Sequence, residues 1–122
     1  MVASVAEERE TTSVGSLPVD VETISANAEL AWQMARGTST REVIDQRTEE
    51  LVGYLNLLRH EDLGQAENKD TQRLLRIVEN HLSMEGRPDR YSPTWEAYNF
   101  MRDTAVFVKT LLATYQKVNG FL

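Results

Sequence analysis

Apolar side chains recur every three or four positions along most of the chain after Pro18, and this spacing predicts four helices and no strand. The first helix is expected over residues 20–36. Asp20 is its expected N-cap, because a carboxylate there can accept hydrogen bonds from unpaired N–H groups of the first turn. Gly37 follows as a stop signal. The apolar stripe of this helix is mostly alanine, which lets a neighbouring helix approach closely.

The second helix is predicted to begin near Thr40, where Ser39 and Glu42 have the spacing of a capping box. Its apolar stripe consists of Ile44, Leu51, Tyr54, Leu55 and Leu58. Gly53 lies off this stripe and costs the helix about 1 kcal/mol relative to alanine.

The third helix is predicted over residues 70–85, with Asp70 as its cap and with Gly86 and Pro88 ending it. Its apolar stripe consists of Leu74, Leu75, Val78 and Leu82.

The fourth helix is the longest and is expected to begin at Ser92 and Pro93, a cap followed by proline at the first helical position. It is expected to end at Asn119 and Gly120. Because the connections are short, residues 18–122 are predicted to form one all-α domain, an antiparallel four-helix bundle. Residues 1–17 are polar and acidic without an apolar period, so we expect a flexible, disordered tail there.

The fourth helix carries two apolar stripes on opposite sides, whereas a surface helix needs only one. The first stripe consists of Tyr98, Met101, Ala105, Val108, Leu112 and Tyr115. The second consists of Phe100, Phe107, Leu111 and Val118. One interpretation places this helix at the centre, surrounded by the other three. The other makes the second stripe the interface of a homodimer or of a complex with another protein, because a small protomer has difficulty covering both sides.

An alternative interpretation concerns a ligand instead of a protein partner. Trp32, Trp95, Tyr98 and Met101 are the aromatic and methionine side chains suited to an adaptable pocket for a small apolar metabolite. Ordinary core packing is the competing explanation for the same residues.

Composition limits the classes of function. The chain has 122 residues, enough for one domain, and no cysteine, which excludes disulfides, thiol catalysis and cysteine-ligated metals. With 13 Lys and Arg against 19 Asp and Glu, the net charge of −6 disfavours direct binding to nucleic acid or to an anionic membrane. No apolar run approaches the roughly 20 residues of a membrane span, and the first residues lack a secretory signal, so we expect a cytoplasmic protein.

Candidate catalytic and metal-binding groups form no known arrangement. A di-iron bundle needs a Glu three residues before each His, but Leu57 and Val78 occupy those positions before His60 and His81. Loops that bind nucleotide phosphates and the Gly-x-Ser-x-Gly motif of hydrolases are missing from the sequence. We therefore expect no catalytic residue, no metal and no cofactor. His81 is expected at the edge of the core, satisfied by Glu85 or by a backbone group.

Residues 51–58 read Leu-Val-Gly-Tyr-Leu-Asn-Leu-Leu, residues 71–75 read Thr-Gln-Arg-Leu-Leu, and residues 100–105 read Phe-Met-Arg-Asp-Thr-Ala. These segments resemble a group of short actinobacterial proteins associated with natural-product biosynthesis, over residues 51–118 at most. The chain departs from that group at Tyr54, where His is usual, and at Thr104, where Leu is usual. The resemblance implies a bacterial, cytoplasmic setting near secondary-metabolite genes and assigns no activity and no functional residue.

These observations predict a small, non-catalytic helical accessory or regulatory protein that forms a homodimer through its C-terminal helix. The alternative is a helical bundle that binds a small apolar metabolite.

Overall fold

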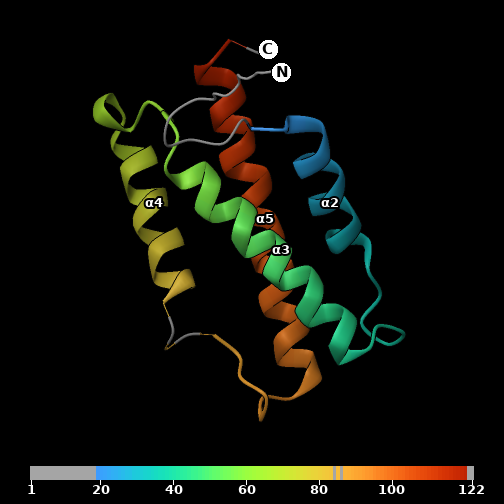
Figure 1. Ribbon diagram of the computed structural model, residues 1–122. Coiled ribbons are helices and arrows are strands. Elements are labelled where there is room, and N and C mark those ends of the chain that lie inside the picture. The colour runs from blue at the N-terminus through green and yellow to red at the C-terminus, as the bar shows by residue number, and fades with distance from the viewer. Residues whose placement is uncertain (1–18, 84, 86, 121–122) are drawn as a thin grey trace, which may run out of the picture.

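The computed structural model describes residues 19–83, 85 and 87–120, and every regular element among them is helical (Figure 1). The elements are α2 (Val21–Gln33), α3 (Arg41–Arg59), the short 3₁₀-helix η1 (Gln65–Glu67), α4 (Lys69–Leu82) and α5 (Thr94–Val118). The predicted all-α fold is therefore confirmed for this part of the chain. The predicted tail at 1–17 and the stop signal at Gly86 lie outside the described residues.

Successive helices form a bundle in which the chain reverses direction at each connection. In Figure 1 the chain descends along α2, rises along α3, descends along α4 and rises along α5. The most extensive helix packing joins α3 to α5, and the next joins α2 to α5. The two helices that pack most extensively therefore run in the same general direction, while α2 and α4 lie on either side of them (Figure 1).

The α5 helix lies at the centre, and its own chain covers most of both apolar stripes, with Val118 of the second stripe left 43% exposed. On the first stripe, Tyr98 is buried and its hydroxyl donates to the Met34 carbonyl at the end of α2 at 2.6 Å. On the second stripe, Phe100 is buried and stacks on His81 of α4. The structure thus agrees with the central-helix interpretation. It corrects the expectation that a single protomer leaves a whole stripe uncovered, because α3 and α2 pack along α5 and His81 of α4 lies against Phe100 and Phe107.

The beginnings of α2 and α3 follow local capping chemistry. Asp20 accepts a hydrogen bond from the Thr23 N–H at 3.1 Å, as predicted. Thr40 caps α3 by accepting from the Val43 N–H at 3.2 Å. The predicted Ser39 cap is wrong, because its hydroxyl donates instead to the Ala35 carbonyl at 2.6 Å.

The α4 helix begins at Lys69, and its N-cap lies two residues before the predicted cap. Asn68 accepts from the Thr71 N–H at 3.0 Å and is the actual N-cap. Asp70 lies inside the first turn and pairs with Arg73 at 2.9 Å. The helix ends at Leu82, where Ser83 adopts an extended backbone, so the predicted end at 85 is three residues too late.

The α5 helix begins at Thr94, with Pro93 at the N-cap position and no side-chain cap. Ser92 does not cap it, because its hydroxyl accepts from the Asp89 N–H at 2.9 Å within the preceding turn. The predicted stop is confirmed: Asn119 ends the helix, and Gly120 takes a left-handed backbone with φ of 81°. No helix in the described part of the chain is long and apolar enough to cross a membrane.

Candidate functional site

The four residues predicted for a dimer interface separate into two groups. Phe100 is 8% exposed and Leu111 is fully buried, so neither offers a surface to a second copy in this conformation. Phe107 is partly buried beside the His81 ring, and Val118 is 43% exposed near the C-terminal end of α5. The second stripe as a whole is therefore not the exposed face that the sequence suggested.

The four residues predicted for a ligand pocket also separate. Tyr98 and Met101 are core residues, whereas Trp32 and Trp95 are 39% and 54% exposed. Tyr98 and Met101 both belong to the main apolar cluster, so core packing is the explanation that fits them. None of these four side chains lines either of the two depressions in the described part of the chain that lie beside Arg41 and beside Gly64.

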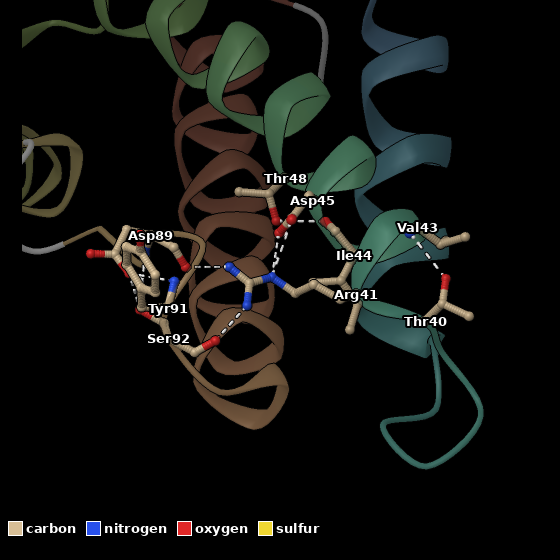
Figure 2. Close-up of polar contacts among 9 residues, drawn as sticks. All are labelled: Thr40, Arg41, Val43, Ile44, Asp45, Thr48, Asp89, Tyr91 and Ser92. Atoms are coloured by element: carbon tan, nitrogen blue, oxygen red, sulfur yellow. Dashed lines mark hydrogen bonds and ion pairs between the residues drawn. The ribbon is translucent and has the colours of Figure 1, made fainter.

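A depression of about 240 Å³ lies between α3, the start of α5 and the loop that joins α4 to α5. Arg41 builds one wall: its guanidinium donates to the backbone carbonyls of Ser92 at 2.5 Å and Asp89 at 2.6 Å. The same guanidinium pairs with Asp45 at 2.9 Å. Figure 2 shows Arg41 extending from the first turn of α3 to this loop. Arg41 therefore fixes the loop against α3.

The charges around this depression are balanced. Its lining contains three arginines and three carboxylates, namely Arg41, Arg87, Arg90, Asp45, Glu49 and Asp89. Such a lining has no net preference for an anion or a cation. The depression carries structural contacts of the loop and does not define a ligand class.

The surface formed by α2 and α5 is different, because it exposes a tryptophan that contacts two cations. The guanidinium carbon of Arg102 lies 3.8 Å from the centre of the Trp32 ring, and the Lys109 ammonium lies 5.7 Å from it. Lys109 also pairs with Glu29 at 2.8 Å. Arg102, by contrast, has no hydrogen-bond acceptor among the described residues, and its Nε is buried without a partner. Stacking on Trp32 holds the guanidinium in place while its donors stay unused.

Two exposed apolar side chains continue this surface along α5. Trp95 is 54% exposed and Val106 is 40% exposed. Trp95, Arg102, Val106 and Lys109 are separated by seven, four and three residues, which places them on one side of the helix. We call Trp32, Trp95, Arg102 and Val106 the tryptophan surface. It combines residue types that are enriched at protein interfaces.

A second unusual group links α4 to the other side of α5. The His81 ring stacks on Phe100 with centres 4.2 Å apart and meets Phe107 edge-on at 5.0 Å. Its Nε2 lies 2.7 Å from the hydroxyl of Thr104, which is fully buried. Burial lowers the pKa of His81 below its ordinary value, as does Arg87 to a smaller extent, while Asp103 acts in the opposite direction. The predicted partners, Glu85 or a backbone group, are replaced by the Thr104 hydroxyl.

Within residues 19–83, 85 and 87–120, no three His, Cys, Asp or Glu side chains lie close enough together to hold a metal ion. His60 donates from its Nδ1 to the Asn56 carbonyl at 2.8 Å at the end of α3.

No family model, curated protein or solved structure matches the chain.

Sequence reasoning missed the tryptophan surface because it treated Trp32 and Trp95 as interior residues. The useful signal was the spacing of Trp95, Arg102, Val106 and Lys109, which matches one helical side between the two apolar stripes. The stacking of Arg102 on Trp32 joins helices far apart in sequence, and no local pattern predicts it.

Proposed function

We propose that the protein is a non-catalytic helical interaction protein that forms a homodimer through the tryptophan surface. The observation that carries the proposal is the exposed Trp32, stacked with an Arg102 that forms no ion pair within the described residues. Trp95 and Val106 are exposed on the same side of α5 and add apolar area to this surface.

The chemistry of the surface indicates that its partner presents a carboxylate beside apolar groups. An immobilised guanidinium with unused donors suits a carboxylate, since the hydrogen bonds it would make are charge-assisted. An exposed tryptophan ring beside it supplies the apolar contact that anchors an interface.

A second copy of the chain carries these groups. Asp103 follows Arg102 on α5, is exposed, and forms no ion pair within the described residues. In a twofold dimer each contact between two different residues occurs twice, once in each direction across the interface. Arg102 of each protomer can therefore pair with the partner's Asp103, with the tryptophans on either side.

Sedimentation equilibrium of the full chain tests this proposal. We expect the wild type to dimerise and Trp95→Ala to weaken the dimer by about 30-fold in Kd or more, as for a hot-spot residue. Tyr91→Ala is the matched control, because Tyr91 is a 79% exposed aromatic outside the surface. A wild type that stays monomeric up to about 1 mM overturns the proposal.

A charge exchange identifies the pairing. Arg102→Asp and Asp103→Arg should each weaken the dimer, and the double variant should recover most of the lost affinity. Failure of the double variant to recover affinity would leave the dimer but contradict the proposed Arg102–Asp103 contact.

The accessory role and the cytoplasmic location stay proposals that derive from the apolar patterning and composition of the chain. The bacterial setting and the link to natural-product biosynthesis stay proposals that derive from the resemblance over residues 51–118. The metabolite-binding alternative loses support, because Tyr98 and Met101 pack in the core while Trp32 and Trp95 lie outside it.

A further inference from the structure

The α4 helix has fewer buried side chains than α2, α3 or α5. Only Thr71 and Val78 of α4 are buried, whereas nine residues of α5 are. Leu74, Leu75 and Leu82 of α4 are partly buried against the core. The attachment of α4 therefore depends on few contacts, and each one has a large share in it.

The His81 contact is the single side-chain hydrogen bond between α4 and α5 among the described residues. Thr104 donates its hydroxyl proton to the Phe100 carbonyl at 2.7 Å. A hydroxyl has one proton to donate, so Thr104 must accept at its oxygen from His81. This assigns the Nε2–H tautomer to neutral His81 and leaves Nδ1 without the proton.

We propose that protonation of His81 releases α4 from α5 and uncovers Phe100 and Phe107, which makes the attachment of α4 pH-dependent. The physical reason is that the imidazole ring is held between two apolar rings and a hydroxyl that is already committed. A charged imidazolium loses solvation on the ring faces that Phe100 and Phe107 cover, so this contact disfavours the protonated form.

The direction of the pH effect follows from the pKa of His81. Burial lowers this pKa below 6.5, while release returns the side chain to water and to its ordinary value. The released state therefore binds the proton more strongly, and α4 attachment is weakened as the pH falls below 6.5. The charged groups acting on His81 are Asp103 on α5, which favours protonation, and Arg87 in the following loop, which opposes it.

Hydrogen–deuterium exchange of residues 69–82 at pH 7.5 and 5.5, corrected for intrinsic exchange, tests the proposal. In the wild type, the population of opened α4 should rise by up to about tenfold for each pH unit of acidification. This rise is expected between the pKa of His81 in the released state and its lower pKa in the attached state. Residues 41–59 of α3 serve as the internal reference and should not respond.

His81→Gln removes the titration and keeps an amide donor that can reach Thr104. It should abolish the pH response of α4. His60→Gln is the matched control, since His60 is exposed at the end of α3, and it should keep the response. Thr104→Val should raise α4 exchange at both pH values, because it removes the acceptor of the His81 proton.

Two results would overturn the proposal: equal α4 protection at the two pH values in the wild type, or an undiminished pH response in His81→Gln. Circular dichroism shows whether each variant is folded, and if His81→Gln is not, the wild-type pH comparison decides alone. The proposal does not depend on dimerisation, so a monomeric wild type leaves it intact.

Discussion

The two sides of α5 differ in how firmly the rest of the chain holds them. Toward α2 and α3, Met101, Ala105 and Val108 are fully buried among apolar side chains. Toward α4, Phe100 keeps 8% exposure, Phe107 is partly exposed, and a histidine makes the polar contact. Dense apolar packing supplies most of the folding free energy, whereas a thin contact with a titratable group can open locally. We infer that one side sets the stability of the fold and the other permits a change of state.

The largest expected effect comes from a leucine-to-alanine substitution in α3, compared with the same substitution in α4. Leu55→Ala in α3 should lower the free energy of unfolding by about 2–5 kcal/mol, because Leu55 is fully buried and its removal leaves a cavity. Leu75→Ala in α4 should cost about 1 kcal/mol or less, since Leu75 is only partly buried. Urea denaturation followed by circular dichroism measures both. Equal losses would contradict the difference between the two sides.

Arg41→Ala should have the next largest effect. It removes charge-assisted hydrogen bonds to the carbonyls of Asp89 and Ser92, so we expect a loss of about 1–3 kcal/mol. Arg41→Lys should lose a smaller part, because an ammonium cannot match the planar donors of the guanidinium. Thermal unfolding of the three proteins ranks them, and an Arg41→Ala variant as stable as the wild type would show that this loop is held by other contacts.

Gly53→Ala should give the smallest effect and the opposite sign. A Cβ at Gly53 meets no atom within 4 Å, so alanine brings only its better helix propensity, about 1 kcal/mol. Because Gly53 lies on α3, the change should raise global stability and leave the local opening of α4 unchanged. Destabilisation by this variant would indicate a contact on the outer face of α3.

Local patterns predicted the helices well, because periodic apolar positions and caps such as Asp20 depend on neighbouring residues only. The ends were less accurate where a side chain had another use: Ser39 bonds Ala35, and Ser92 bonds Asp89. The sequence alone could not decide whether α5 lies at the centre of the bundle. Its two apolar stripes indicate that something packs against each of them, but not whether another helix of the chain or a second protein does so. The contacts of Arg102 with Trp32 and of His81 with Thr104 join distant segments, so only the three-dimensional structure displays them.

Native-state hydrogen exchange of the wild type at pH 7, in rising but sub-denaturing urea, tests the unequal attachment most directly. We predict that amides of residues 69–82 exchange through a local opening of lower free energy than those of α3 and the buried side of α5. Exchange of α4 with the same free energy and urea dependence as α3 would show that the four helices open as one unit, and would contradict it.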